Sequence, residues 1–166
     1  MRVWSTTIAR EAVPATVTLG DRSETVTPST PAQPFTDATI ARAAEGETAE
    51  TGEQEVPLIV LAWARSGDKG DAFNIGVVAR RAEYLPHIRA ALTEEAMRTY
   101  FAHEFEGAKA PAVHRYELPG LNALNLHFLD ALGGGQFASL RLDPLAKGKA
   151  QQLLDFPVRV PAGLVA

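Results

Sequence analysis

The sequence predicts an α+β fold: one mostly antiparallel sheet with helices on one face, preceded by an extended N-terminal arm. Three observations support this prediction. Apolar runs of strand length recur after residue 56, and several are joined by short connections that suit hairpins. Helical patterns are too few for a doubly wound parallel sheet. The first 55 residues are poor in the large apolar side chains that a core requires.

The composition is that of a globular chain without disulfide bonds. Its 166 residues are 46% hydrophobic and 22% charged, with no cysteine, which excludes thiolate zinc sites and cysteine nucleophiles. The net charge of −4 argues against a general nucleic-acid binder. No apolar run reaches the roughly 20 residues of a membrane span, and the N-terminus lacks the apolar core of a secretion signal. We therefore expect a cytoplasmic protein that binds neither nucleic acid nor membrane.

Residues 1–55 form the predicted acidic arm and residues 56–166 the predicted folded domain, with net charges of −5 and +1. Val3–Ala9 and Ala15–Gly20 could be short strands, whereas the prolines of Thr27–Pro34 exclude a helix or an inner strand. An arm of this composition needs a partner surface to become ordered.

The domain begins with two predicted strands and a short helix. Val56–Ala64 is a nearly continuous apolar run, which predicts a central strand buried on both faces, with Trp63 in the core. Phe73–Arg81 is rich in β-branched residues and predicts a second strand. A short helix is expected over Glu83–Leu92, with Pro86 in its first turn.

The second half alternates between helices and strands. Thr93 suits the N-cap of a helix that is expected to end at Gly107. Strands are predicted over Ala112–Gly120, Ala123–Leu132 and Phe137–Asp143.

Asp143 is expected to cap a final helix over Pro144–Phe156. The resulting order of strand, strand, helix, strand, strand, strand and helix fits a ferredoxin-like split βαβ arrangement best.

The connection with the sequence RSGDKGD contains more charged side chains than a turn requires. In one interpretation, Gly67 and Gly70 turn backbone amides inward to bind an anion, provided that the two aspartates are paired elsewhere. In a second, the stretch is structural, and its aspartates accept backbone amides. In a third, it contacts a partner chain. The candidate substrate-binding or anion-binding residues are Arg65, Ser66, Gly67, Asp68, Lys69, Gly70, Asp71 and Arg141.

Two histidines are candidates for acid–base chemistry. His114 and His127 fall on adjacent predicted strands and could approach each other across a hairpin, with Glu117 or Asp130 as a partner. The alternative is that both are simply hydrogen-bonded. The histidine spacings match no local metal motif, so no metal site is expected.

Other polar and glycine positions have two interpretations each. Gly133–Gly135 could allow a ligand or a second backbone to approach closely, or could be a flexible link. Asn74 and Asn125 lie in apolar strands, where an amide needs partners, and we expect both to bond loop backbone. Arg141 could join Arg65 in contacting an anion or could pair with Asp143.

Three segments carry a resemblance to a known family. LAWARSGDKGDAFNIGVVARR (61–81), LNALNLHFLDALGGG (121–135) and ASLRLDPLAKGKAQQLLDFPV (138–158) resemble the ferredoxin-like C-terminal domain of the AtuA family, named for acyclic terpene utilisation. Members carry this domain behind a large N-terminal body, or as a separate small protein beside a large one. The resemblance implies a ferredoxin-like fold and a role in the breakdown of branched, terpenoid acyl-CoA thioesters.

Three hypotheses about function follow. In the first, the chain is the small subunit or terminal domain of an AtuA-like enzyme complex, with a coenzyme A thioester as substrate and no other cofactor. In the second, it is a non-catalytic module that organises a homo-oligomer or a complex with a larger AtuA-type body. The third, a free-standing hydrolase or lyase that uses His114 or His127, lacks a nucleophile, a metal set and paired carboxylates.

Overall fold

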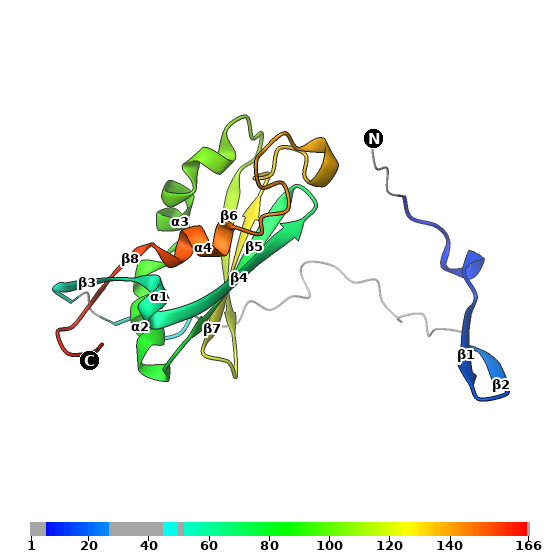
Figure 1. Ribbon diagram of the computed structural model, residues 1–166, viewed down its shortest axis with the longest axis horizontal. Coiled ribbons are helices and arrows are strands. Elements are labelled where there is room, and N and C mark those ends of the chain that lie inside the picture. The colour runs from blue at the N-terminus through cyan, green and yellow to red at the C-terminus, as the bar shows by residue number, and fades with distance from the viewer. Residues whose placement is uncertain (1–5, 27–44, 50–51, 166) are drawn as a thin grey trace. The chain divides into compact units, whose positions relative to one another are not determined.

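The structure is a computed structural model that describes residues 6–26, 45–49 and 52–165. The chain divides into two compact units, Met1–Ala41 and Arg42–Ala166. Figure 1 labels the elements of both units.

The first unit contains a β-hairpin. The strands β1 (Ala15–Leu19) and β2 (Arg22–Val26) pair antiparallel, after the short 3-10 helix η1 (Arg10–Ala12). Gly20 has a φ of 59°, as the two-residue turns of hairpins require. Every residue of both strands is exposed.

The hairpin bears out one of the two strands expected in the arm. The strand expected at Ala15–Gly20 is present. In contrast, Thr6–Ala9, the described part of the other expected strand, is irregular. Thr27–Pro34 lies outside the described residues.

The second unit is built on a mostly antiparallel sheet. Its strands are β3 (Gln54–Pro57), β4 (Ala62–Lys69), β5 (Ala72–Ala79), β6 (Ala112–Leu118), β7 (Ala123–Leu129) and β8 (Pro157–Val160). Four of them form one antiparallel sheet in the order β4-β5-β7-β6, while β3 and β8 pair as a separate antiparallel ribbon. The α+β class and the antiparallel sheet are therefore confirmed.

Short helices cover one face of this sheet. They are α1 (Leu58–Leu61), η3 (Ala82–Tyr84), α2 (Leu85–Ala91), α3 (Glu94–Tyr100), η4 (Ala102–Phe105), η5 (Gln136–Ala138) and α4 (Lys149–Leu154). Pro86 lies in the first turn of α2, as expected. The Thr93 hydroxyl accepts the Ala96 amide at 3.1 Å and caps α3.

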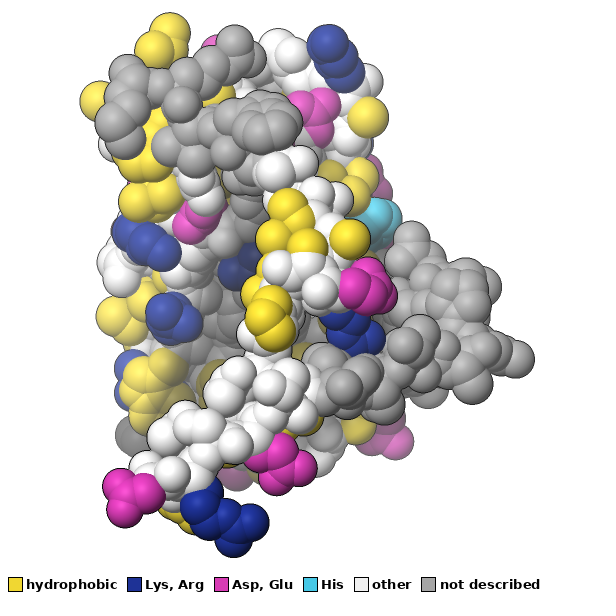
Figure 2. All heavy atoms as spheres, turned by 90° about the vertical axis from the view of Figure 1, so that its right-hand side faces the viewer, with side chains coloured by type: hydrophobic (Ala, Val, Ile, Leu, Met, Phe, Trp, Pro, Cys, Tyr) yellow, Lys and Arg dark blue, Asp and Glu magenta, His cyan; other side chains and the backbone are white. Residues whose placement is uncertain are grey.

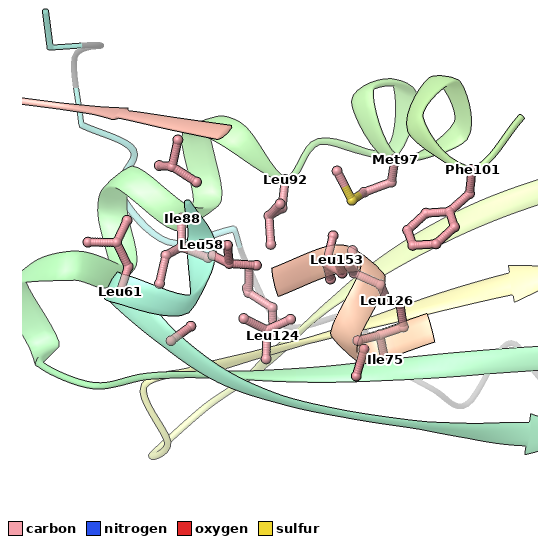
Figure 3. Packing of buried hydrophobic residues seen from close by; sticks show 14 of the residues in the cluster. Leu58, Leu61, Ile75, Ile88, Leu92, Met97, Phe101, Leu124, Leu126 and Leu153 are labelled. Carbon is pink, nitrogen blue, oxygen red and sulfur yellow. The ribbon is translucent and has the colours of Figure 1, made fainter. Parts of the chain in front are cut away.

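The core lies between these helices and the sheet. Figure 3 shows Leu, Ile, Met and Phe side chains from the helices pointing at side chains of the strands, among them Ile75, Leu124 and Leu126. The rings of Phe73 and Phe128 stack at 4.4 Å between centroids. Because all of these side chains are fully buried, they form a packed core between the helices and the sheet.

The prediction of one central strand over Val56–Ala64 is wrong. β3 ends at Pro57, α1 forms one helical turn, and β4 begins at Ala62 on the edge of the sheet. A short apolar run does not distinguish a strand from a buried helical turn. Trp63 is consequently not in the core: it is 53% exposed, with the Arg80 guanidinium 4.6 Å from its ring centroid.

The strand predicted over Phe137–Asp143 is also wrong. Residues 130–148, here called the 130–148 loop, contain only the turn η5 and otherwise irregular backbone. The alternating pattern has another cause: Arg141 turns inward to bond the helix layer, while Leu140 and Leu142 on either side are fully exposed. The last helix begins at Lys149 and is shorter than expected.

Two acidic residues ahead of Val56 belong to the second unit and contact its helix α2 and strand β6. Arg89 donates to the carbonyl of Glu47 at 3.2 Å, and the guanidinium of Arg115 lies 3.4 Å from the carboxylate of Glu45. Part of the predicted arm is thus attached to the domain, while the boundary at residue 56 stays a prediction. Among the described residues, no helix has the length and apolar character needed to cross a membrane.

Candidate functional site

The stretch Arg65–Asp71 is mostly strand rather than connection. β4 continues to Lys69, so only Gly70 and Asp71 form the turn into β5. Gly70 has a φ of 72°, whereas Gly67 lies inside the ladder between β4 and β5. The prediction that Gly67 and Gly70 both turn backbone amides inward around an anion is therefore wrong, because Gly67 is paired within the strand β4.

Two polar side chains of this stretch bond the 130–148 loop and the start of α4. The buried Ser66 hydroxyl donates to the carbonyl of Ala146 at 2.6 Å and accepts the amide of Ala150 at 2.9 Å. The Asp68 carboxylate lies 3.8 Å from Nζ of Lys147. Ser66 and Asp68 thus attach the 130–148 loop and α4 to the edge of the sheet.

Asp71 is the third side chain of this stretch that bonds the 130–148 loop, at the segment Gly133–Gly135. Its Oδ1 accepts the amide of Gly134 at 2.7 Å and that of Leu132 at 3.2 Å. A Cβ on Gly135 would lie 2.0 Å from the carbonyl oxygen of Gly70, so only glycine allows the two backbones to approach this closely. Of the two interpretations of Gly133–Gly135, the close approach of a second backbone is confirmed.

The face of the sheet that points away from the helices is the open face. Strand register places its residues in rows across the four strands. One row comprises Gly67, Asn74, His127 and His114. The next comprises Arg65, Gly76, Asn125 and Tyr116. Nδ2 of Asn74 donates to Oδ1 of Asn125 at 2.8 Å, so the two amides bond each other instead of loop backbone as expected.

A shallow hollow of about 310 Å³ lies on the open face beside β4. It is lined by Arg65, Ser66, Gly67, Asp68, Lys69, Asn74, Gly76 and Lys147. Two glycines keep it open: a Cβ on Gly76 would meet nothing closer than the Arg65 carbonyl oxygen at 3.9 Å, and one on Gly67 would lie 3.4 Å from Nζ of Lys147.

Positive charge predominates around this hollow. Among the described residues, the exposed Arg65 forms no ion pair, and Nζ of Lys69 donates to the backbone carbonyl of Asp68 at 3.1 Å. Asp68, the acidic residue of the lining, is already beside Lys147. β4 lies at the front of Figure 1, and this side of the molecule is on the left in Figure 2. Lys and Arg side chains alternate there with hydrophobic ones. The hollow can therefore receive a negatively charged group.

His114 and His127 lie directly opposite each other on β6 and β7, as expected. Burial lowers the pKa of His127, and the charges of His114 and Lys69 lower it further. Nδ1 of His114 lies 4.0 Å from the Glu94 carboxylate. The lowered pKa of His127 favours its neutral form.

The other carboxylates considered for this pair are engaged elsewhere. Glu117 lies 2.9 Å from the guanidinium of Arg89 on the helix side of the sheet. Asp130 accepts the amides of Ala110 and Lys109 at 2.8 and 2.5 Å, which lowers its pKa. Neither carboxylate is available to activate His114 or His127.

Arg141 pairs with a residue that the sequence did not suggest. Its guanidinium lies 3.4 Å from Glu104, a buried carboxylate that also pairs with Lys149. Arg141 therefore neither joins Arg65 nor pairs with Asp143, because the buried carboxylate holds it in the helix layer. The structure brings Arg65 and Lys69 together at the hollow and leaves Arg141 outside.

Sequence reasoning missed two groups at the hollow. Lys147 lies within the helix predicted over Pro144–Phe156, and only the fold brings it to β4. Gly76 lies within the strand predicted over Phe73–Arg81. A glycine inside a strand often marks a place where a ligand or another backbone approaches closely. Among the described residues, no group of three His, Cys, Asp or Glu side chains could hold a metal ion.

The fold and the site together define the class of protein: a ferredoxin-like α+β domain whose open sheet face carries a cationic hollow. The particular family follows from comparison. The model of the AtuA ferredoxin-like domain matches residues 56–159, more than half of the chain, and the chain belongs to this family. No curated protein and no solved structure matches it at a significant level.

Proposed function

We propose that this chain is a non-autonomous part of an AtuA-type assembly that acts on branched, terpenoid-type acyl-CoA thioesters or related carboxylates. Its contribution is an anion-binding surface on the open face of the sheet. The anionic part of the substrate, a phosphate of coenzyme A or a carboxylate, binds in the hollow beside Arg65, Lys69 and Lys147.

One observation supports this proposal above the others. Three cationic side chains surround a hollow that two glycines keep open, and the acidic residue of its lining is already paired. Asp68 is beside Lys147, and the exposed Arg65 forms no ion pair with any described residue. An exposed guanidinium suits bidentate binding of a phosphate or carboxylate.

The surrounding residues explain why the chain works with a larger body. The hollow is shallow and lies at a sheet edge, so it covers one side of a ligand, whereas substrate sites bury most of the ligand surface. His127 stands beside Asn74 of the hollow and is the acid–base candidate of this surface. The remaining walls and the reacting groups come from the larger AtuA-type body.

Calorimetric titration with coenzyme A and with a branched acyl-CoA thioester tests this proposal. Arg65→Gln and Lys147→Gln should each weaken binding about 5-fold to 10-fold, and the wild-type affinity should fall as salt rises. Arg98→Gln is the matched control, because Arg98 is an exposed cation on α3. Equal affinities for wild type, Arg65→Gln and Arg98→Gln would reject the anion site.

A second function, that of a non-catalytic assembly module, is favoured by a different observation. Trp63 and Val78 are paired on the open face and remain 53% and 45% exposed. Exposed aromatic side chains of this kind are typical of interfaces. If the module interpretation is right, Trp63→Ala should abolish complex formation with a larger AtuA-type protein in mass photometry, whereas Lys147→Gln should leave it intact.

A further inference from the structure

The hollow on the open face is continued at one end by an exposed aromatic side chain. Trp63 and Arg65 point to the same face of β4, two residues and therefore about 7 Å apart. Trp63 and its cross-strand neighbour Val78 form the row next to that of Arg65 and Gly76. The open face beside β4 thus has a cationic part and, directly adjoining it, an indole ring.

The indole of Trp63 is held in place and still offers ring surface. The guanidinium of Arg80 lies 4.6 Å from the ring centroid, and its Nε donates to the carbonyl of Ile59 at 2.9 Å. Arg80 is therefore fixed between the backbone and the ring. Because Trp63 nevertheless remains 53% exposed, a second flat group can stack on it.

The charge of the hollow suits a ligand with more than one negative charge. Its lining contains three cationic side chains and one carboxylate, a net charge of +2. A single carboxylate of a ligand would offset half of this charge, whereas a diphosphate would offset all of it.

Glycine forms the floor between the cationic part and the indole. Gly67 and Gly76 lie on neighbouring strands, in two adjacent rows of the open face. A Cβ on Gly76 would have only the Arg65 carbonyl oxygen within 4 Å, at 3.9 Å. Since no side chain rises from either glycine, a ligand can lie flat along β4 from Lys69 towards Trp63.

We propose that Trp63 and the hollow form one site for a nucleoside diphosphate, either free or as the nucleotide part of a larger molecule such as coenzyme A. The base stacks on the indole of Trp63, and the phosphates bind beside Arg65, Lys69 and Lys147. A ribose separates base and phosphate by a distance comparable with the roughly 7 Å between Trp63 and Arg65. This inference rests on the anion site of the proposed function and selects a phosphate over a carboxylate as its ligand.

Trp63 can report directly on the base. The chain has two tryptophans, Trp4 and Trp63, so Trp4→Phe leaves Trp63 as the single tryptophan of the full-length protein. ADP and coenzyme A should quench its fluorescence to saturation. Pyrophosphate, which has no base, should bind with little quenching.

Calorimetric titration of full-length variants measures the contribution of the ring. Trp63→Leu should weaken the binding of ADP and coenzyme A about 10-fold and leave that of pyrophosphate unchanged. Trp63→Phe retains a ring and should keep most of the affinity. Leu121→Ala is the matched control, because Leu121 is an exposed apolar residue of the turn between β6 and β7, and it should change no affinity.

Comparing the two nucleotides identifies the source of the ligand. Tighter binding of coenzyme A than of ADP would identify coenzyme A, and equal affinities would indicate a free nucleotide. An unchanged melting temperature of Trp63→Leu would show that the fold is intact, as the exposure of Trp63 leads us to expect.

Other results would overturn the inference, and they are distinguishable from a failure of the proposed function. If neither pyrophosphate nor a nucleotide binds, the anion site itself is wrong. If pyrophosphate and ADP bind equally tightly and Trp63→Leu changes neither affinity, the anion site stands and the base does not contact Trp63. Quenching by a branched fatty carboxylate but not by ADP would place a hydrocarbon chain on Trp63 and would also refute the nucleotide site.

Discussion

Replacing Gly135 with alanine tests the joint between the β4–β5 turn and the 130–148 loop. Gly135 has φ 70° and ψ 162°, a conformation nearly confined to glycine. A Cβ there would lie 2.0 Å from the carbonyl oxygen of Gly70, which is backbone and cannot rotate away. Gly120 is a matched control, because it also has a positive φ, 82°, but a Cβ there would meet nothing within 4 Å.

The expected magnitudes follow from these two environments. Gly120→Ala costs about 1 kcal/mol for the left-handed conformation, partly offset by the reduced entropy of the unfolded chain. Gly135→Ala costs about 1–3 kcal/mol for its conformation. It also displaces the neighbouring Gly134 amide from Asp71, a charge-assisted hydrogen bond of about 1.5–3 kcal/mol. The total of roughly 2.5–6 kcal/mol is a large part of a typical domain stability of about 5–15 kcal/mol.

Urea unfolding followed by far-ultraviolet circular dichroism measures both variants. We expect Gly135→Ala to lose at least about 2 kcal/mol more free energy of unfolding than Gly120→Ala. If the two variants lose the same amount, the two backbones are not in contact. In that case the structural account of the RSGDKGD and glycine segments is wrong.

Three further predictions concern single side chains. Glu104→Gln should lower the free energy of unfolding by about 3 kcal/mol, because Lys149 and Arg141 would remain largely buried without a carboxylate. Ser66→Ala should cost about 2–4 kcal/mol in the same assay, since a buried carbonyl and a buried amide both lose their partner. His127→Gln should reduce the loss of stability in acid. The folded-state pKa of His127 is lowered, so the stability it contributes is present above the unfolded-state pKa of about 6.5 and is lost as the pH falls through the folded-state value.

Controls for these variants come from the same chain. Glu95→Gln removes an exposed carboxylate from α3 and should change stability by less than about 0.5 kcal/mol. His87, whose pKa burial also lowers, contributes in the same pH range, so His127→Gln should reduce the acid effect only in part. An unaltered pH profile for His127→Gln, or a Glu104→Gln loss no larger than that of Glu95→Gln, would contradict the reasoning.

Much of the fold was predictable because local patterns decide it. The β-branched run of β5, the alternation of β7 and the N-cap Thr93 each act through neighbours in sequence, and each prediction is confirmed. The expected approach of His114 and His127 is confirmed for the same reason, since two strands joined by a Pro-Gly turn pair antiparallel.

The errors occur where a distant partner decides the structure. The run Val56–Ala64 is apolar throughout, and only the position of β4 at the sheet edge exposes Trp63. Arg141 lies in an alternating pattern that predicts a strand, but the buried carboxylate of Glu104, 37 residues earlier in the chain, pulls it inward.

The sequence by itself determined the composition, the family resemblance, most of the strands and the charged stretch that marks the site, since these depend on residue type and short-range spacing. Tertiary structure alone decided which members of that stretch are structural. Ser66, Asp68 and Asp71 bond the 130–148 loop, α4 and Lys147, whereas Arg65 and Lys69 remain on the open face. The physical reason is that hydrogen bonds and ion pairs between segments some 60 to 80 residues apart depend on how the chain packs, which no local pattern encodes.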